Sequence, residues 1–332
     1  MNDKDRFAPS EQILSGETAD VYFLHARRIL EAEGSDADVT MEVFPSRDGI
    51  LCGMEEVRQL LKKVLSPGGE AWAIPEGKKI EKREVTLRIS GSYREFGIYE
   101  TAILGILAQE SGWASATRSC VEAAGGTPVI HFGARHVHPD VSARLEYAAF
   151  VGGCSGCATP AGATLAGIEP SGTIPHALIL CIGDTVEAIE AFDRYIDPKV
   201  KRIALVDTFK DEAEESLRVA RALGDRLWGV RLDTPAERGR VTPELVQEVR
   251  ARLDQADFKY VRIVVSGGID PARIYLFQKQ RAPVDAFGVG SAISSAAPID
   301  FTADIKQIEG RPVAKRGRIP GVTPNPRLER II

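Results

Sequence analysis

The sequence predicts an α/β protein built around a parallel α/β barrel. Between residues 202 and 295, short apolar runs rich in β-branched or aromatic residues are followed or separated by charged segments with helical periodicity. Each run also ends in a small group of polar residues or glycines. Strands that alternate with amphipathic helices form parallel β/α units, and ligand chemistry in such folds collects where the strands end. The runs are Ile203–Val206, Trp228–Leu232, Val261–Val265 and Val284–Val289.

The groups that follow the last two runs are typical of a phosphate site. Ser266-Gly267-Gly268 follows one run, and Gly288-Val289-Gly290-Ser291 closes the next. Glycines let backbone N–H groups approach an anion, and a following helix N-terminus adds partial positive charge. Asp270 and Pro271 are a good N-cap and first-turn pair for a helix over Ala272–Lys279. The alternative is that both groups are ordinary glycine turns. Because the two groups end strands of consecutive β/α units, we favour a phosphate site.

Composition excludes several classes of protein. The chain has 332 residues, of which 44% are hydrophobic and 27% charged, as in a globular protein with room for a barrel and a smaller domain. The net charge of −5 argues against a nucleic-acid partner, because no basic surplus exists to neutralise a phosphate backbone. No run approaches about eighteen apolar residues, and the polar N-terminus lacks a signal-peptide core. We therefore expect no membrane partner and a cytoplasmic location.

The cysteines predict packing rather than disulfide or metal chemistry. The chain has five, an odd number that suggests reduced thiols. Cys154 and Cys157 form a single CxxC without the second ligand pair that a structural zinc site usually needs. We expect these residues to be buried, as free cysteines often are.

The N-terminal third reads as a β-rich region with flanking helices. Its first helix starts after Asp20, so Asp20 and Tyr22 lie near the positive end of the helix dipole. The end of the chain resumes a strand-like pattern, which we expect to return to this region and complete it. The expected elements are helices near Val21–Leu30, Met54–Leu65, Thr101–Gln109 and Ala114–Ala124, and strands at Val39–Phe44, Ala71–Ile74, Val85–Ile89, Phe301–Ile308 and Arg311–Lys315.

A strand over Pro128–Phe132 is followed by an unusual polar segment. His131, His136 and His138 are three of the five histidines in the chain, but their spacing matches no usual zinc pattern. We favour local hydrogen bonds or capping for them, with a metal site as the alternative. Arg135 lies beside a glycine at the strand end, where a guanidinium is well placed to bind an anion.

His176 is a candidate catalytic residue. It follows a further predicted strand and turn, and it opens a helix over Ala177–Cys181. A lone histidine is more often structural than catalytic. His176, however, shares its inferred face with Asp207, Arg231 and Asp233, which makes the two interpretations about equally weighted. The helix N-terminus favours a neutral, nucleophilic imidazole.

An ordered set of motifs resembles the nicotinate phosphoribosyltransferases, particularly their short archaeal and bacterial form. The match is colinear over nearly the whole chain, and the set is specific although no single motif is. The motifs are Thr18–Phe23, Pro75-Glu76-Gly77, Tyr99-Glu100-Thr101, Phe132–Arg135, Ser171–His176, Leu205–Thr208, Gly229–Asp233, Ser266-Gly267-Gly268, Phe287–Gly290 and Pro312–Lys315.

The resemblance implies an irregular, open α/β barrel joined to an α/β sandwich domain built from both chain ends. The sandwich would comprise residues 1–118 with 297–332, and the barrel residues 119–296. It further implies phosphoribosyl transfer from phosphoribosyl pyrophosphate to nicotinate with Mg²⁺, ATP as a possible co-substrate, and a homodimer or higher homo-oligomer with shared active sites. Physical chemistry agrees, because an oxocarbenium-like transition state needs its diphosphate leaving group neutralised.

The resemblance also assigns roles to single residues. Phe132 and Tyr22 would stack on the pyridine ring, with Tyr22 and Asp20 supplied by the neighbouring subunit. Arg135 and Arg231 would hold diphosphate or the substrate carboxylate. Asp233 would contact the ribose hydroxyls, Asp207 would support Mg²⁺ or the histidine, and His176 would be the residue that is phosphorylated in ATP-coupled members. The residues that would bind the 5′-phosphate are Gly267, Gly268, Gly290 and Ser291. Thr173 and Thr208 are further candidate substrate-binding residues.

Two departures and two alternatives accompany this interpretation. The chain ends at Ile332 without the cysteine-rich metal knuckle of the archaeal form. Ser155 stands where nicotinamide-using relatives place an acidic residue, which favours an acid as the substrate. The acceptor could instead be nicotinamide, quinolinate or another nitrogen heterocycle, although quinolinate should require more basic residues. A non-catalytic binding descendant is the second alternative.

Overall fold

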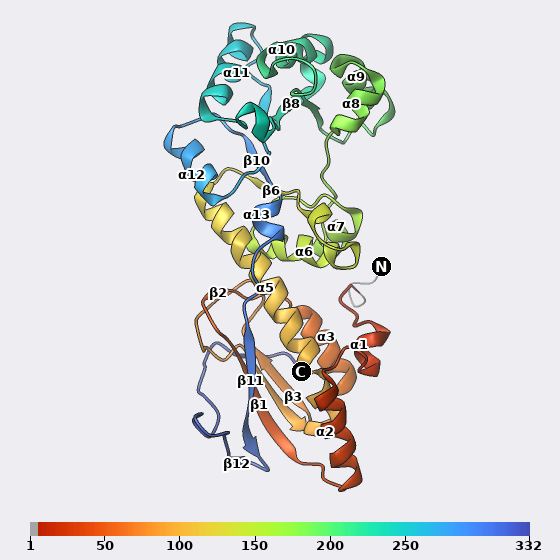
Figure 1. Ribbon diagram of the computed structural model, residues 1–332, viewed down its shortest axis with the longest axis vertical. Helices are drawn as coiled ribbons and strands as arrows, with labels where there is room; N and C mark the ends of the chain where they lie inside the picture. Colours follow the sequence, from red (N-terminus) through yellow and green to blue (C-terminus); the bar gives the residue numbers. More distant parts are fainter. Residues whose placement is uncertain (1–5) are drawn as a thin grey trace. The chain divides into compact units, whose positions relative to one another are not determined.

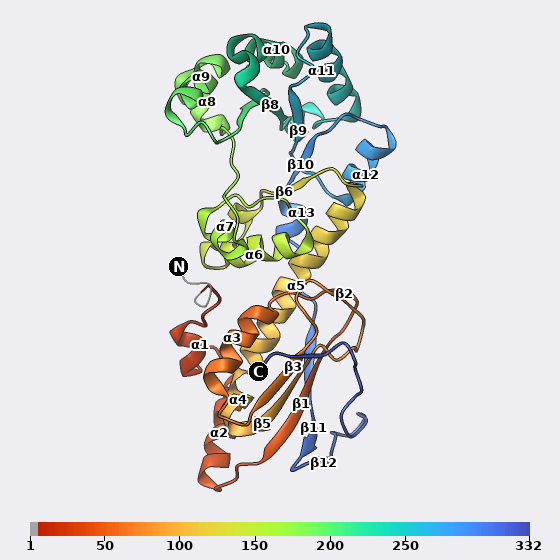
Figure 2. The ribbon, with the colours of Figure 1, turned by 180° about the vertical axis from the view of Figure 1, so that it is seen from behind.

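A computed structural model describes residues 6–332 and divides the chain into two compact units. Unit 1 contains the residues up to Ser115 together with Ala296–Ile332, and unit 2 contains Ala116–Ser295. Figures 1 and 2 show the two units from opposite sides. The fold is the predicted mixed α/β class, with an antiparallel sheet in one unit and an open, parallel α/β barrel in the other.

Unit 1 is an antiparallel sheet with helices packed on it. Its six strands lie in the order β12-β11-β1-β5-β3-β13, and β2 pairs with β4 separately. The strands are β1 (Asp38–Pro45), β2 (Gly49–Ile50), β3 (Glu70–Ala73), β4 (Lys79–Ile80), β5 (Leu87–Ser92), β11 (Phe301–Ile308), β12 (Arg311–Pro312) and β13 (Glu329–Arg330). The helices are α1 (Glu11–Ser15), α2 (Val21–Ala32), α3 (Met54–Val64), α4 (Tyr93–Phe96), the 3₁₀ turn η1 (Gly97–Tyr99) and α5 (Glu100–Ala123), which ends in unit 2.

The returning C-terminal strand completes this sheet as predicted. β11 pairs antiparallel with β1, with Val43 opposite Ala303, and β1 pairs on its other side with β5. Alternating residues of these strands, such as Met41 and Val43, pack with Leu60 and Leu61 of α3 in one core. The helices gather on one side of the sheet in both views (Figures 1 and 2).

Unit 2 contains five parallel strands in the order β6-β10-β9-β8-β7. Successive strands from β7 to β10 are neighbours joined by helices, as parallel β/α units require. The strands are β6 (Val129–His131), β7 (Arg202–Leu205), β8 (Leu227–Leu232), β9 (Arg262–Val265) and β10 (Ala286–Val289). The helices are α6 (Pro139–Gly152), α7 (Pro160–Ala166), α8 (His176–Ile182), α9 (Thr185–Tyr195), α10 (Glu212–Leu223), α11 (Pro243–Gln255), α12 (Pro271–Lys279) and α13 (Ser291–Ser294), with 3₁₀ turns η2 (Ala134–His136), η3 (Gly224–Arg226) and η4 (Ala236–Arg238).

Three predictions about the elements need correction in extent or in kind. The two helices predicted on either side of Gly112 are one helix, α5. Gly112 does not interrupt this helix but lets a neighbouring segment pack closely against it. A β-carbon on Gly112 would lie 2.6 Å from the carbonyl oxygen of Ala297. No strand directly precedes His176, because residues 167–175 form the loop between α7 and α8. The strand predicted at Arg311–Lys315 pairs only over Arg311–Pro312, where Pro312 faces Gln307.

Candidate active site

Arg231 is at the centre of the polar cluster at the carboxyl ends of the parallel strands. It lies near the end of β8 and is only 14% exposed. Its Nη1 donates to Thr173 Oγ1 at 2.8 Å, and its Nη2 donates to Asp233 Oδ2 at 3.3 Å. The guanidinium also lies 5.6 Å from the ring centroid of Phe132, within cation–π range. Arg231 therefore joins three of the predicted site residues.

Asp207 and His176 form a second polar pair in this unit. His176 opens α8, Asp207 follows β7, and His176 Nε2 lies 3.1 Å from Asp207 Oδ2. The Asp207 side chain is 1% exposed, whereas that of His176 is 38% exposed. Burial raises the pKa of Asp207, and the nearby charge of Asp233 acts in the same direction while His176 opposes it. The second oxygen of Asp207, Oδ1, is buried and has no hydrogen-bond partner among the residues that the structure describes.

Asp233 is fixed by the loop that follows β9. Ser266 Oγ donates to Asp233 Oδ1 at 2.7 Å. Gly267 has a φ of +84°, and a β-carbon there would lie 3.1 Å from the same carboxylate oxygen. A side chain at Gly267 would thus be both strained and crowded, so glycine is needed for Asp233 to keep its place.

Phe132 is positioned by the Phe287–Gly290 motif. Its backbone N–H donates to the carbonyl of Val289 at 2.7 Å. A β-carbon on Gly288 would lie 2.3 Å from Cε2 of the Phe132 ring, so the ring occupies space that only glycine leaves open. Gly290 and Ser291 follow directly, at the start of the short helix α13.

Four predicted residues are less tightly connected. Arg135 is exposed on η2. Ser155 Oγ donates to the carbonyl of Val129 at 3.1 Å, so its hydroxyl is engaged by the backbone. Thr208 Oγ1 is buried without a hydrogen-bond partner among residues 6–332. Gly268 lies beside Gly267 in the same loop, with a φ of +65°.

The three histidines near β6 have different surroundings. His138 Nδ1 accepts from the backbone N–H of Asp140 at 3.3 Å and so caps α6. His136 Nδ1 lies 3.1 Å from Ser294 Oγ. His131 is fully buried, 3.6 Å from a carboxylate oxygen of Glu146. The contact of His138 is therefore the local capping that we predicted. His136 instead reaches a residue far along the chain, and neither ring nitrogen of His131 has a hydrogen-bond partner among the described residues.

Asp20 and Tyr22 lie in unit 1, where they join residues of one other motif. Asp20 is the N-cap residue of α2, and its Oδ2 accepts from Tyr22 at 3.2 Å and from Thr101 Oγ1 at 3.0 Å. Burial raises the pKa of the neighbouring Glu100 to about 7, and the charge of Asp304 adds to this rise. The N-terminal motif and the Tyr99-Glu100-Thr101 motif therefore form one polar cluster.

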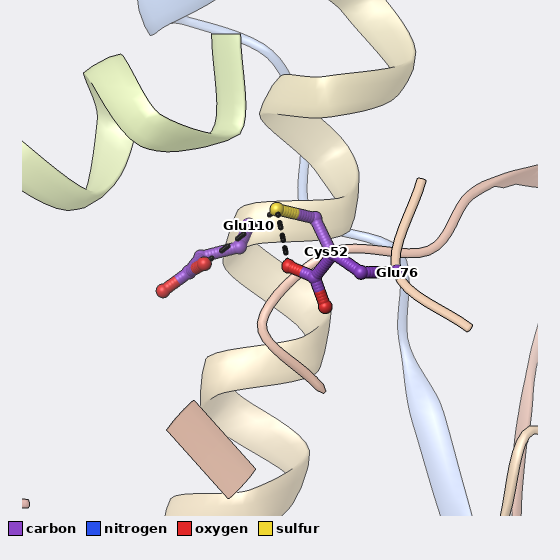
Figure 3. Close-up of side chains that lie close together, drawn as sticks. All are labelled: Cys52, Glu76 and Glu110. Carbon is purple, nitrogen blue, oxygen red and sulfur yellow. Dashed lines mark hydrogen bonds between the residues drawn. The ribbon is translucent and has the colours of Figure 1, made fainter. Parts of the chain in front are cut away.

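The Pro75-Glu76-Gly77 motif has a structural role. The ligand atoms of Cys52, Glu76 and Glu110 lie within 4.8 Å of one another, which makes them a candidate metal site (Figure 3). The Glu76 carboxylate, however, already accepts from the backbone N–H groups of Gly53 at 3.0 Å, Met54 at 2.8 Å and Glu55 at 3.3 Å. These donors start α3, whose N-cap residue is a glycine without a capping side chain. Glu76 is thus a capping residue supplied from outside the helix.

This role predicts a large effect on stability. Replacing Glu76 with alanine should lower the free energy of unfolding by about 2–4 kcal/mol, because three buried N–H groups lose a carboxylate acceptor. Urea denaturation of the whole chain would measure it. Glu33→Ala, at an exposed position, is the matched control and should change stability by less than about 0.5 kcal/mol. Equal effects of the two substitutions would contradict the capping role.

Sequence reasoning missed two arginines and a serine of this region. Ser266 was part of a motif but was not singled out, although it fixes Asp233. Arg240 and Arg273 both approach the Gly267–Gly268 loop from different segments. Arg273 lies three residues after the N-cap Asp270, a spacing that could have indicated it. No spacing in the sequence indicated Arg240, because only the three-dimensional structure shows that its side chain lies beside Gly268.

Among the residues that the structure describes, no helix is both long enough and apolar enough to cross a membrane.

Comparisons with known proteins agree on one family. Models of the N-terminal and C-terminal domains of quinolinate phosphoribosyl transferase match residues 20–111 and 113–304. A crystal structure of nicotinate-nucleotide pyrophosphorylase from Pyrococcus furiosus has 44% sequence identity and a TM-score of 0.87, over 95% of this chain and 81% of that one.

Curated relatives carry a different name and are longer. Nicotinate phosphoribosyltransferase pncB2 of Mycobacterium tuberculosis is 32% identical over 228 residues, 68% of this chain and 48% of that protein. The nicotinate phosphoribosyltransferase of Bacillus subtilis is 28% identical over 231 residues, 68% of this chain and 46% of that protein. The match therefore spans about half the length of these relatives. Since the C-terminal domain model alone covers more than half of the chain, the chain belongs to the quinolinate phosphoribosyltransferase family.

Proposed function

We propose that this enzyme transfers the phosphoribosyl group of phosphoribosyl pyrophosphate to nicotinate, forming nicotinate mononucleotide and diphosphate for NAD biosynthesis. The observation that supports this most is the contact of Arg231 with the face of Phe132. An aromatic face beside a buried guanidinium suits a flat ring that carries a carboxylate. The names of the curated relatives point the same way.

The number of cations near Phe132 favours nicotinate over quinolinate. Quinolinate carries two carboxylates, and each would need compensation in a partly buried site. Among the described residues, Arg231 is the guanidinium in cation–π contact with Phe132, while Arg135 is exposed on η2. The names of the two matching domain models keep quinolinate as the second candidate acceptor.

The acidic residues fit a hard divalent cation such as Mg²⁺. Asp207 Oδ1 is an orphaned, buried carboxylate oxygen, and the charge of Asp233 is close enough to affect its pKa. Oxygen donors of this kind are those that Mg²⁺ prefers. When bound, Mg²⁺ would supply positive charge to neutralise the diphosphate leaving group. Asp207 and Asp233 are the residues that would hold it.

The side chains divide the remaining tasks. Phe132 and Tyr22 stack on the pyridine ring so that its nitrogen faces C1′ of the ribose. The new bond forms from that nitrogen to C1′ as the bond from C1′ to diphosphate breaks. Arg231 pairs with the carboxylate of nicotinate. Arg135 adds positive charge near the diphosphate, most of whose charge Mg²⁺ would neutralise. Asp233 accepts hydrogen bonds from the ribose hydroxyls.

A parallel assay tests the acceptor. Phosphoribosyl pyrophosphate is incubated with nicotinate, nicotinamide or quinolinate at equal concentration, with Mg²⁺, and mononucleotide, diphosphate and carbon dioxide are measured. We expect kcat/KM for nicotinate to exceed that for the other two acceptors by at least tenfold. Carbon dioxide release with quinolinate at a higher kcat/KM would assign the quinolinate reaction instead, and no product with any acceptor would overturn the proposal.

We also propose that Asp20 and Tyr22 act in a neighbouring subunit of a homodimer. Val21, Tyr22 and Ile29 of α2 are 61%, 59% and 60% exposed, an apolar surface of the kind that subunit interfaces cover. Tyr22→Ala and Arg231→Ala should each be inactive. Mixing the two proteins under conditions of subunit exchange should restore about a quarter of the activity, because some hybrid sites contain neither substitution. Mixed proteins that stay inactive although mass spectrometry detects hybrids would contradict a shared site.

A further inference from the structure

The segment 155–157 lies along the free edge of β6. β6 is the first strand in the order of the parallel sheet, and β10 is its partner on the other side. The backbone N–H of Ser155 donates to the carbonyl of Val129 at 2.8 Å, and the N–H of His131 donates to the carbonyl of Gly156 at 3.2 Å. The 155–157 segment therefore extends the sheet on the side where β6 has no partner strand.

The same segment connects β6 with residues that contact Arg231. The backbone N–H of Ser171 donates to the carbonyl of Cys157 at 2.7 Å, and two residues later Thr173 accepts from Arg231 Nη1 at 2.8 Å. Phe132, which directly follows β6, lies 5.6 Å from the Arg231 guanidinium. The position of the 155–157 segment therefore affects two of the contacts that Arg231 makes.

Glu146 of α6 anchors the end of this segment. Its side chain is fully buried. Its Oε1 accepts from the backbone N–H of Ala158 at 2.6 Å, and its Oε2 accepts from the backbone N–H of Thr159 at 3.1 Å and from the Thr159 hydroxyl. Burial acts to raise the pKa of Glu146, but His131 and these donors lower it below its usual value. Glu146 is therefore a buried, ionised carboxylate, which is stable only while its partners are in place.

His131 faces this carboxylate from β6. The imidazole is fully buried, and its Nδ1 lies 3.6 Å from Glu146 Oε1. An N–H group on Nδ1 is attracted to the carboxylate at this distance, because water does not screen two buried groups. Glu146 therefore links the chain after the 155–157 segment to the residue that precedes Phe132.

Two glycines leave the space that this pair occupies. A β-carbon on Gly133 would lie 2.6 Å from His131 Nε2, and a β-carbon on Gly162 would lie 2.2 Å from Glu146 Oε2. Gly133 follows Phe132, and Gly162 lies in the first turn of α7. Because both distances are shorter than packed atoms allow, side chains at these positions would displace the pair.

We propose that Glu146 and His131 are positioning residues for the pyridine acceptor. Glu146 fixes the segment that carries Ser155, and His131 joins this anchor to the strand that carries Phe132. Both side chains are fully buried, so they act through Phe132 and Arg231 and not on the acceptor itself. A site that is already in place lowers the cost of ordering it when the acceptor binds. This inference rests on the proposed transfer to a pyridine.

Steady-state kinetics with each substrate varied tests this role. Glu146→Gln should raise KM for nicotinate by about 10- to 100-fold, because small displacements of a binding site have effects of this size, and should leave KM for phosphoribosyl pyrophosphate within about twofold. His131→Leu should resemble Glu146→Gln. The double variant should lose no more than about threefold beyond either single variant, since the two residues act as one unit.

Glu215→Gln is the matched control. Glu215 is also a fully buried carboxylate of unit 2, and it pairs with Arg218 at 2.9 Å. Its loss should lower the melting temperature as the loss of Glu146 does, but both KM values should stay within about twofold of wild type. A purely structural role of Glu146 would give the same pattern as Glu215→Gln, with less active protein and unchanged KM values.

The outcomes separate this inference from the proposed function. A folded Glu146→Gln protein whose KM for nicotinate stays within about twofold of wild type, or rises equally for both substrates, would overturn the positioning role. If circular dichroism shows that Glu146→Gln is unfolded, Glu146→Asp and His131→Leu carry the same comparison. If the wild type uses quinolinate, the same selective rise in KM for quinolinate would support the positioning role while the proposed acceptor fails. A wild type that uses no pyridine acceptor would overturn both.

Discussion

Arg231→Ala is expected to lower kcat/KM for nicotinate by about 10³-fold, the largest loss of any single substitution in the site. Removing one partner of a buried ion pair costs about 3–5 kcal/mol, and the middle of this range corresponds to roughly 10³-fold in rate. Arg231 also holds Thr173 and Asp233 and contacts Phe132, so the substitution disturbs three other residues. Steady-state kinetics with both substrates varied would measure the loss, and thermal unfolding would show whether the fold is kept.

Two further variants sharpen this test. Arg231→Lys keeps the charge but not the planar fork, so its loss should be intermediate, about 10- to 100-fold. Arg135→Ala should lose less than tenfold, because the exposed Arg135 holds no other site residue. An Arg231→Ala protein that is folded and retains more than a tenth of wild-type kcat/KM would refute the central role of Arg231.

His176→Asn is expected to abolish ATP hydrolysis and ATP stimulation of transfer while a slow, ATP-independent transfer survives. Since an ionised Asp207 can only accept, the proton of the imidazole lies on Nε2, 3.1 Å from Asp207 Oδ2. Nδ1 then carries the lone pair. In an ATP-coupled reaction Nδ1 would attack the γ-phosphorus of ATP, and ADP would leave with the electrons of the broken P–O bond.

Labelling with γ-³²P ATP would measure this step. The wild type should carry acid-labile, alkali-stable phosphate, and His176→Asn should carry none. Asp207→Asn should label at least tenfold more slowly, because the amide no longer fixes the tautomer or stabilises the charged imidazole. A wild-type protein with neither label nor ATPase activity would show that His176 only binds substrate.

The sequence predicted the parallel strands well because their signal is local. Each buried run in unit 2 is continuous and apolar, and each of the observed strands β7 to β10 lies within two residues of its predicted run. The cap at Asp270 was also correct, since capping depends on only a few neighbouring residues. Gly112 shows the limit. Glycine is needed at this position because of its close contact with Ala297, a residue far away in the sequence that local helix propensity does not take into account.

The same distinction applies to the candidate site. Residues that follow strands, such as Asp207 and Asp233, could be placed on one face from periodicity alone. Their partners could not be derived, because the contact of His176 with Asp207 or of Arg231 with Thr173 joins segments far apart in the chain. Arg240 was missed for the same reason.

The late position of β11 in the chain has a consequence for folding during synthesis. β1 pairs with β5 on one side, but its other partner, β11, is made only after the whole of unit 2. Until then, the sheet of unit 1 exposes an edge of unpaired N–H and C=O groups to other nascent chains. Unit 2 has no such delay, because all its strands are contiguous in the sequence. The barrel of unit 2 can therefore fold while the chain is still being made, and β11 completes the sheet of unit 1 afterwards.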